Sequence, residues 1–554
     1  RGLCVWRWLA WRCGERTVSP GERVSPCEWR WVLVFAALLL ALTTVPYVLA
    51  WEMQGDGWRF TGALFGVEDT NAYLSKIRLG AQGHWLATLR TTNEPHDGAF
   101  VYVAYLLLGH FARVLAGGAP VPVGTLIAVF HGARLVFGLA LVLVTYRFVA
   151  MFLRRPATRR LALVLITLGG GLGWVVSLLG AENLFGSLPV DFIVPEGYTF
   201  LILFGLPHLA LARSALLLGF LCLFAALRGN PARNALLAGL CWAVMGLAVP
   251  FYIAVVYAVL GAWGLAAWLR TRRFPIELLY RAVAAALVPL PVLAYNAWVF
   301  VGNDVFAQWA SQNRLPSPHP AHYVLGYAVL GTLAVLALRW AWRRGAVRAP
   351  YLLLVSWIVA APVLVYLPVN VQRRLAEGVI VPLGILAAIG WQRSAVRRPT
   401  LVRGAVLTLV LGTSVLLWLG GLVSALAPSR PIFRPVAEIS AMEALNTLAP
   451  PDAVVLSRHE TGNLLPVYTG LIAYVGHGPE TIHAEEKEAR VTAFLRDELE
   501  PEERAALLVE VDYVLVGPLE RADALGSGWQ QGLREIAAFG EGADRFVVYE
   551  VVRD

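Results

Sequence analysis

The residues best suited to chemistry are two adjacent acids, Glu68 and Asp69, in a long polar loop. They stand about 17 residues after an apolar run, and a weakly amphipathic stretch from Ala72 to Leu89 follows them. A carboxylate in such a loop could act as a general base on an acceptor hydroxyl. Alternatively, Asp69 caps the helix that follows, as Thr70 or Asn71 could also do. From these residues alone, the helix cap is the favoured interpretation.

A second group of candidates is basic. Arg373 and Arg374 lie in the short loop LPVNVQRRLAEG between two apolar runs, where an anionic partner would explain their position. The planar guanidinium of arginine can donate two parallel hydrogen bonds to a phosphate. A salt bridge to Glu377, or burial of the stems in lipid with the charges at the headgroups, would explain them equally well.

Two further arginines, Arg134 and Arg213, fall inside apolar runs. A charge in that setting costs on the order of 3 kcal/mol or more and usually faces a cavity or a partner. We therefore expect both to be available to an anionic ligand. The nearby His131 and His208, together with His96, are candidates for lining a polar cavity, although a lone histidine in such a run is more often a packing residue.

The remaining polar residues give weaker signals. Those of the segment 181–201 and the loop 301–321 need no explanation beyond exposure to water; they are Glu182, Asp191, Glu196, Asp304, Gln312, Asn313, Arg314 and His319. His84, His96 and Asp97 could join Asp69 around a divalent metal, but their spacing matches no metal-binding signature. No cofactor is therefore indicated, and a metal is only an alternative.

The rest of the chain must position these residues in a membrane. Of the 554 residues, 58% are hydrophobic and 15% charged, and the mean hydropathy is +0.62. This composition excludes an ordinary soluble enzyme and a disordered protein. Apolar runs of spanning length lie at about 31–51, 123–152, 161–180, 202–227, 234–250, 251–270, 276–300, 322–342, 350–368, 377–391 and 401–427. We therefore predict a mainly α, polytopic membrane protein with about eleven transmembrane helices, broken at Pro250 between the fifth and sixth.

Orientation follows from the positive charges. The net charge of +9 comes from arginines clustered between apolar runs rather than on one polar face, which argues against nucleic-acid binding. If the apolar run 99–116 lies along the interface, the main clusters fall on the same side as the N-terminal tail, residues 1–30. We therefore expect a cytoplasmic tail, a membrane domain over 31–427 with a long first external loop at 52–122, and an external C-terminus.

The residues after 427 have a different composition. Charged residues become frequent, and the short apolar runs 453–456, 512–517 and 546–552 alternate with helix-like stretches at 436–448, 483–509 and 529–538. This pattern predicts a small extracytoplasmic α/β domain over 428–554. Its polar candidates are His459, Glu460, Tyr468 and His477, for which exposure on surface loops is the simpler explanation.

Taken together, these features resemble the GT-C superfamily of membrane glycosyltransferases. The resemblance rests on the acidic pair Glu68-Asp69 in a long first loop, and on the interfacial segment Pro95 to Leu115 with Tyr102 and Tyr105. It also rests on a second span that opens with His131-Gly-Ala-Arg134, and on a soluble C-terminal domain. The resemblance covers the membrane part through its architecture more than through identical residues. Glu68 and Asp69 are adjacent, whereas many members of the superfamily have a spaced acidic pair.

The resemblance implies a cell-membrane enzyme that transfers a sugar from a polyprenyl-phosphate donor to an external glycan, lipid or protein. Asp69 would then be the base and Glu68 its neighbour. Arg373 and Arg374, with Arg134 or Arg213, would stabilise the leaving phosphate, and a single displacement would invert the anomeric carbon. Two alternatives remain open, namely a transporter or flippase of lipid-linked sugars, and a non-catalytic membrane assembly protein.

Overall fold

The computed structural model describes residues 23–553 except 182, 344–348, 395–398 and 525–527. Most of the predicted cytoplasmic tail and the candidate Glu182 therefore lie outside the described residues. Contacts divide the chain into two units. We call the first, residues 1–42, 134–295 and 315–417, the helical unit, and the second, residues 43–133, 296–314 and 418–554, the mixed unit.

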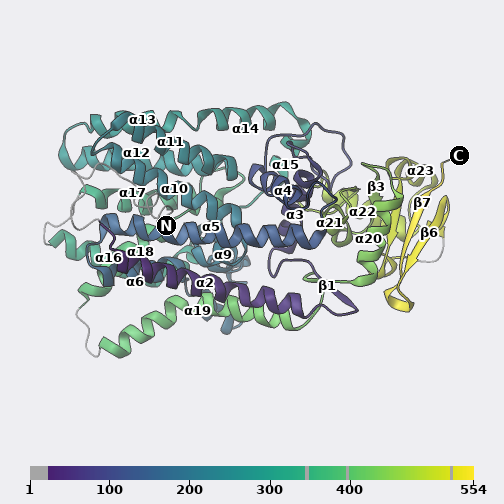
Figure 1. The fold of residues 1–554 in the computed structure, drawn as a ribbon, viewed down its shortest axis with the longest axis horizontal. Coiled ribbons are helices and arrows are strands. Elements are labelled where there is room, and N and C mark those ends of the chain that lie inside the picture. The colour runs from purple at the N-terminus through teal and green to yellow at the C-terminus, as the bar shows by residue number, and fades with distance from the viewer. Residues whose placement is uncertain (1–22, 182, 344–348, 395–398, 525–527, 554) are drawn as a thin grey trace. The chain divides into compact units, whose positions relative to one another are not determined.

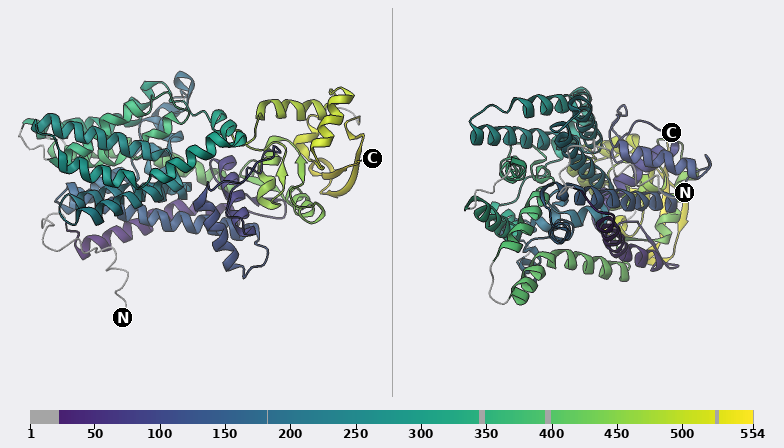
Figure 2. Two further views of the ribbon diagram at one scale, coloured as in Figure 1. Left: turned by 90° about the horizontal axis from the view of Figure 1, so that it is seen from above. Right: turned by 60° about the vertical axis from the view of Figure 1, so that its left-hand side comes forward.

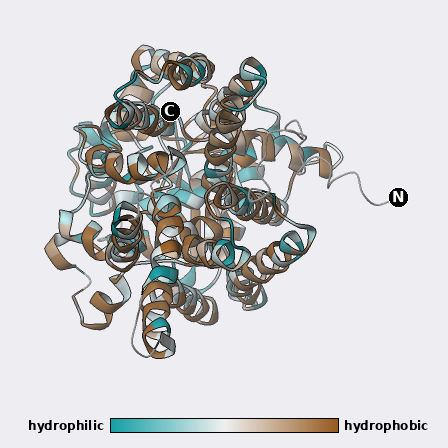
Figure 3. Ribbon diagram, turned by 90° about the vertical axis from the view of Figure 1, so that its left-hand side faces the viewer, coloured by the Kyte–Doolittle hydropathy of each residue, from teal (hydrophilic) through white to brown (hydrophobic). Residues whose placement is uncertain are grey.

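The helical unit is built from long apolar helices that run alongside one another (Figures 1 and 2) and are predominantly hydrophobic (Figure 3). The helices that lie in it wholly or in part are α2 (Pro26–Glu52), α5 (Val123–Phe152), α6 (Pro156–Thr167), α7 (Gly173–Leu178), α8 (Val190–Ile193), α9 (Thr199–Gly205), α10 (Pro207–Ala226), α11 (Pro231–Ala248), α12 (Tyr252–Thr271), α13 (Ile276–Leu287), α14 (Leu290–Gly302), α16 (Pro320–Arg343), α17 (Ala349–Leu364), α18 (Ile380–Arg393) and α19 (Pro399–Leu426). Short 3-10 turns are η1 (Leu184–Gly186), η2 (Pro195–Gly197) and η3 (Gln372–Ala376).

Seven helical stretches of the described residues are long and apolar enough to cross a membrane, and the pair α13–α14, bent by 45°, would make an eighth. The chain is therefore a multi-pass membrane protein. The number is smaller than the eleven predicted spans for local reasons. The run 161–180 is split into α6 and α7, α11 begins with a charged turn, and α17 has only 16 residues. The predicted break at Pro250 is confirmed, because α11 ends at Ala248 and α12 begins at Tyr252.

The mixed unit combines the first loop with the C-terminal segment. Its first-loop elements are β1 (Trp58–Phe60), α3 (Val67–Gln82) and α4 (Val103–Leu115), and α15 (Asp304–Gln312) joins them. Its C-terminal elements are β2 (Phe433–Pro435), α20 (Val436–Leu448), β3 (Val454–Leu456), α21 (His459–Tyr468), β4 (Ile472–Ala473), α22 (Ala484–Leu495), α23 (Pro501–Glu510), β5 (Tyr513–Val516), α24 (Pro518–Arg521), η4 (Gly528–Gln530), β6 (Leu533–Phe539), η5 (Gly542–Asp544) and β7 (Phe546–Val551).

A five-stranded sheet organises the C-terminal part, in the order β4-β3-β5-β7-β6. The first three strands are parallel, and β7 and β6 add antiparallel pairs. Side chains of a strand alternate between two faces, so Val455 packs in a cluster with α20 and α21 while its neighbour Leu456 packs in one with α22 and α23. This confirms the predicted α/β character of the segment.

One predicted element of this part is wrong. Residues 529–538 have a helix-like composition, but residues 533–539 form strand β6, paired with β7 from Leu533 to Phe539. Leucine, arginine, glutamate and alanine favour a helix locally, and pairing with an existing sheet edge overrides that preference. The predicted helix 483–509 is also two helices, α22 and α23, because Pro501 starts a new helix after the left-handed residue Asp497.

The first loop is fastened to the C-terminal segment through backbone contacts. Strand β1 pairs antiparallel with β2, with Phe60 opposite Phe433. A second contact joins the backbone N–H of Ala473, in β4, to the carbonyl of Arg90 (2.8 Å). The loop that carries the acidic pair is therefore a structural part of the mixed unit.

Candidate active site

The acidic pair lies in the first turn of α3. Gly66, in a left-handed conformation (φ 53°), occupies the N-cap, and Glu68 and Asp69 follow inside the helix. Negative charges are stabilised there by the helix dipole. The interpretation of Asp69 as a helix cap is therefore wrong, because Asp69 lies inside the helix and the N-cap residue is a glycine with no side-chain cap.

Glu68 is held by the C-terminal segment. Its Oε1 accepts a hydrogen bond from the backbone N–H of Gly478 (2.7 Å) and lies 3.2 Å from Nε2 of His459. The other ring nitrogen of His459 lies 2.7 Å from Glu488. Burial would raise the pKa of Glu68, but the His459 bond, the charge of His477 and the Gly478 N–H lower it below its usual value. Glu68 is therefore an ionised, fixed neighbour of Asp69.

Asp69 is the more exposed acid, with 56% of its side chain accessible, and its Oδ1 lies 3.5 Å from Nε2 of His477. The backbone N–H of Glu480 donates to Nδ1 of His477 (3.2 Å), so the neutral ring presents its Nε2–H to Asp69. Burial would lower the pKa of His477, but its hydrogen bond to Asp69 and the charge of Glu480 raise it. Asp69 is thus an oriented carboxylate that remains open to solvent.

A buried ion pair also joins α3 to the C-terminal segment. Lys76 also belongs to α3. Its Nζ lies 2.6 Å from Oε2 of Glu480, and both side chains are 1% exposed. The hydroxyl of Tyr102 donates to the other oxygen of Glu480 (2.8 Å), and the Tyr102 ring stacks on Trp309 of α15. Burial would raise the pKa of Glu480, but Lys76 lowers it. Residues 477–480 are therefore fixed to α3 at both ends.

The loop 301–321 supports the same segment. The side-chain amide of Gln312 donates to the carbonyls of Pro479 (3.3 Å) and Thr481 (2.8 Å), and its oxygen accepts from the backbone N–H of His483 (3.0 Å). Gln312 thus holds the backbone of the turn that faces Asp69, rather than serving only as a solvated surface group.

Sequence reasoning named His459, His477 and Gln312 among weaker candidates and missed Lys76 and Glu480. A usable signal was present, because Lys76 is one of only two lysines in a chain whose other basic residues are arginines. The second lysine, Lys487, also joins the C-terminal segment to the first loop, because it pairs with Glu94 (2.7 Å).

The predicted phosphate-binding arginines belong to the helical unit. Arg373 and Arg374 lie in η3, and the backbone N–H of Arg373 bonds to the carbonyl of Leu315 (3.4 Å). Arg374 lies 3.7 Å from Glu196 and packs over the ring of Phe251. Both side chains remain partly exposed. The expected partner Glu377 is paired elsewhere, with Arg213.

Arg213 has a structural environment. It is fully buried, and its guanidinium binds both oxygens of Glu377 (2.6 and 2.9 Å) and the hydroxyl of Thr199 (3.1 Å). It also donates to the carbonyl of Glu196. Every guanidinium nitrogen therefore has a protein partner, which corrects the expectation that Arg213 is available to a phosphate.

Of the other candidates, Arg134, His131 and His96 contact backbone carbonyls. Arg134 is buried and donates to Leu203 (3.2 Å). His131 contacts the carbonyl of Gly62 (2.9 Å), and His208 lies at the second position of α10, partly exposed. His96 bridges its own loop, accepting from the Leu89 N–H (2.9 Å) and contacting the Glu94 carbonyl (2.8 Å). Among the described residues, no group of three His, Cys, Asp or Glu is placed to hold a metal ion.

Comparisons with known proteins agree with this architecture. No family model and no curated protein sequence matches the chain. Solved structures do match at low identity. The arabinofuranosyltransferase AftD from mycobacteria has a TM-score of 0.54 at 17% identity over 97% of this chain and 41% of its own. The oligosaccharyltransferase of Archaeoglobus fulgidus, tethered to an acceptor peptide, gives 0.50 at 12% identity over 93% and 74%.

A third similar structure matches nearly end to end. ArnT from Cupriavidus metallidurans, in the apo state, gives a TM-score of 0.50 at 14% identity over 94% of this chain and 97% of its own. Identities this low establish the fold and leave the chemistry to the site. The chain therefore has the fold of the GT-C membrane glycosyltransferases.

Proposed function

We propose that the protein is a glycosyltransferase that moves a sugar from a polyprenyl-phosphate donor to an external acceptor. The observation that carries the proposal is the solvent-accessible carboxylate of Asp69, oriented by His477 in a loop that is fastened to the C-terminal segment. A surface acid needs no such support, whereas a general base must be held within reach of the proton it takes.

In the proposed reaction, the acceptor hydroxyl oxygen attacks C1 of the sugar and its proton passes to Asp69. The bond between C1 and the phosphate oxygen breaks, polyprenyl phosphate leaves, and the anomeric carbon is inverted. Glu68, tied to Gly478 and His459, keeps α3 in register with the turn 476–480. The partly exposed Arg373 and Arg374 are the proposed contacts for the leaving phosphate.

The proposal also assigns sides of the membrane. The predicted orientation places the first loop and residues 428–554 outside the cytoplasm, where a glycan, lipid or protein acceptor would be met. A lipid-linked donor keeps its tail in the bilayer and its scissile bond at headgroup depth, so a loop beside the membrane surface can reach it.

The proposal is tested with Asp69→Asn in proteoliposomes supplied with decaprenyl- and undecaprenyl-phosphate hexoses and pentoses. Release of polyprenyl phosphate should fall by about 10²- to 10⁴-fold, as expected on loss of a general base. Asp97→Asn, an exposed acid of the same loop, is the matched control and should keep full turnover. Equal turnover of both variants would remove Asp69 as the base. Movement of intact donor across the vesicles without release would favour a flippase.

A further inference from the structure

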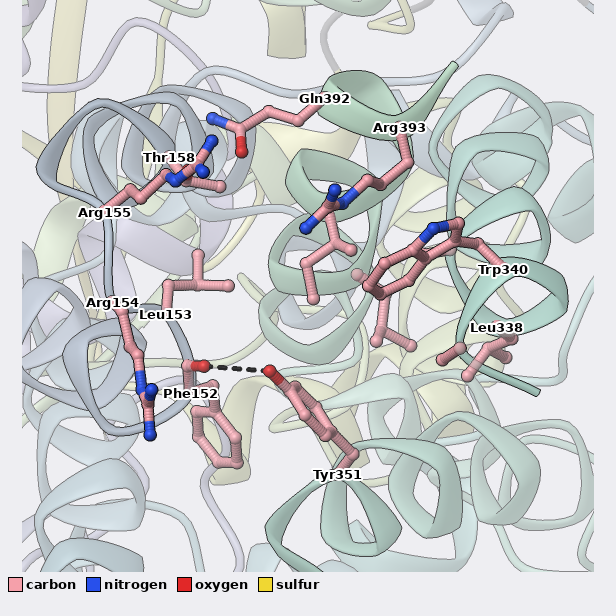
Figure 4. Close-up of a pocket in the computed structure, with 14 residues that line it drawn as sticks. Phe152, Leu153, Arg154, Arg155, Thr158, Leu338, Trp340, Tyr351, Gln392 and Arg393 are labelled. Atoms are coloured by element: carbon pink, nitrogen blue, oxygen red, sulfur yellow. Dashed lines mark hydrogen bonds between the residues drawn. The ribbon is translucent and has the colours of Figure 1, made fainter. Parts of the chain in front are cut away.

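The helical unit contains a cavity of about 250 Å³ that the proposed reaction does not use. It lies where α5 ends and α6 begins, beside the last turns of α16 and α18 and the start of α17 (Figure 4). Its lining combines three arginines with apolar side chains, and the residues that matter here are Phe152, Arg154, Arg155, Leu338, Tyr351 and Arg393.

The arginines form a cationic rim. Arg154 and Arg155 occupy the link between α5 and α6, and Arg393 is the last residue of α18, on the other side of the cavity in Figure 4. Arg393 packs over the ring of Trp340, 4.2 Å from its centre. All three are exposed, and no carboxylate within the described part of the chain forms an ion pair with any of them.

An arginine close to the rim does have an acidic partner. Arg159, one turn further along α6, is buried and lies 2.8 Å from its own partner, Glu28. The charge of Arg159 is thus neutralised within the protein, whereas the three arginines of the rim can contact an external anion. Such a cluster at a mouth between helices attracts anionic groups.

Apolar side chains line much of the rest of the cavity, and we call this surface its floor. Phe152, Leu338, Leu386 and Ile389 line it, and the hydroxyl of Tyr351 donates to the Phe152 carbonyl (3.0 Å), so that its polar atom is already satisfied. A free phosphate would fill the rim and leave this floor exposed to water. A phosphate that carries hydrocarbon would cover both surfaces.

The cavity is also separate from the proposed donor contacts. Helix α18 begins at Ile380, shortly after Arg373 and Arg374, and ends at Arg393 on the rim. Its 14 residues span about 21 Å, so the two arginine groups lie at opposite ends of one helix. The clusters near 154–160 and 393–403 are those that the positive-inside rule assigns to the cytoplasmic side.

We propose that this cavity binds the phosphate headgroup of an anionic phospholipid from the cytoplasmic leaflet. Arg154, Arg155 and Arg393 contact the phosphate, and an acyl chain covers the floor at Leu338 and Phe152. The lipid would bridge the α5–α6 link to the ends of α16 and α18, and the proposal does not depend on the glycosyltransferase reaction.

The test is native mass spectrometry of the purified full-length protein titrated with phosphatidylglycerol, and with phosphatidylcholine of the same chains. The wild type should bind phosphatidylglycerol in preference, and R154Q/R155Q/R393Q should weaken that binding by about tenfold or more. The matched control is R272Q/R273Q, at an exposed turn outside the cavity, which should stay within about twofold of wild type. Equal binding of the two lipids, or equal loss in both variants, would overturn the proposal.

Two further arms separate the alternatives. Ala341→Phe fills the cavity and leaves every arginine in place, so it should also weaken phosphatidylglycerol binding, and unchanged binding would contradict a site inside the cavity. Inorganic phosphate at millimolar concentration should not displace the lipid. Displacement would show a site for a soluble anion, and preference for undecaprenyl phosphate over phosphatidylglycerol would show a second donor site; either result overturns the proposal.

Discussion

At the scale of single residues, the two lysines share one role. Lys76 of the first loop pairs with Glu480 of the C-terminal segment, and Lys487 of that segment pairs with Glu94 of the first loop. The compact ammonium of lysine fits a closed site that the wider guanidinium of arginine would not. The pairs therefore join the loop that carries Asp69 to the α/β part from both sides.

The Lys76–Glu480 pair gives a stability prediction. Lys76→Met should destabilise the mixed unit by about 3–5 kcal/mol, because Glu480 would remain buried without its countercharge. Limited proteolysis of the first loop measures the effect. The double variant K76M/E480Q removes both charges and should recover part of the loss. If K76M were as resistant to protease as wild type, the pair would contribute little to holding the loop.

His459 gives a pH prediction. Burial would lower the pKa of His459, but Glu68 and Glu488 raise it, so its stabilising contribution is complete below its ordinary pKa of 6.5 and is lost as the pH rises through the raised value. The pKa of Glu68 is lowered, so its contribution is complete above 4.5 and is lost as the pH falls through the lowered value. The contact between Glu68 and His459 should therefore be most stable between the lowered pKa of Glu68 and the raised pKa of His459.

Hydrogen exchange of the amides in 476–480 tests this, after correction for the intrinsic pH dependence of exchange. Protection should decrease from pH 6 toward about pH 9 in the wild type. In His459→Gln the alkaline decrease should be smaller, because the titrating group is gone. A decrease of equal size in the variant would assign the effect to another residue.

At the scale of elements, the backbones of α3 and α4 pack in direct contact where the two helices cross. A Cβ added at Gly109 would lie 2.0 Å from the carbonyl of Ile77, and one at Gly80 would lie 2.2 Å from that of Leu106. These backbones can approach only because both positions are glycine. The crossing sets the position of α3, and so of the acids in its first turn, relative to Tyr102 at the N-cap of α4.

Gly109→Ala should therefore separate the two helices. We expect donor turnover to fall by at least about tenfold, since a displacement near 1 Å at a reacting group can cost 10²-fold. Gly132→Ala, in α5, is the control, because a Cβ there meets nothing within 4 Å. Wild-type turnover in G109A would mean that the crossing does not position Asp69.

The success of sequence analysis also differed between elements. Helix α20 and strands β3, β5 and β7 were predicted nearly at their observed bounds, because period and composition agree there. Strand β6 was missed because its helix-favouring residues are overruled by the edge of β7. The interpretation of Asp69 as a helix cap is wrong because the helix begins three residues earlier, at Gly66, in a left-handed conformation that the pattern of side chains does not predict.

At the scale of the whole molecule, the chain builds its mixed unit from segments far apart in sequence. Glu68 and His459 are separated by 391 positions, and Lys76 and Glu480 by 404. Local patterns could identify a polar loop and an α/β segment, but not that the acids of one meet the histidines of the other. Composition could likewise locate Arg213 and Arg374, but not that Arg213 is enclosed with Glu377 whereas Arg374 stays partly exposed beside Glu196.

That difference separates a structural arginine, Arg213, from a proposed donor contact, Arg374, in the helical unit. Glu377→Gln should leave the buried guanidinium of Arg213 without its countercharge and destabilise the protein by about 3–5 kcal/mol, lowering its melting temperature in detergent. Arg374→Gln removes a partly exposed charge 3.7 Å from Glu196, so it should lower the melting temperature less than Glu377→Gln does and raise KM for the polyprenyl-phosphate donor. The opposite result, with a stable E377Q that binds donor poorly and an unstable R374Q, would exchange the two roles and move the phosphate contact to Arg213.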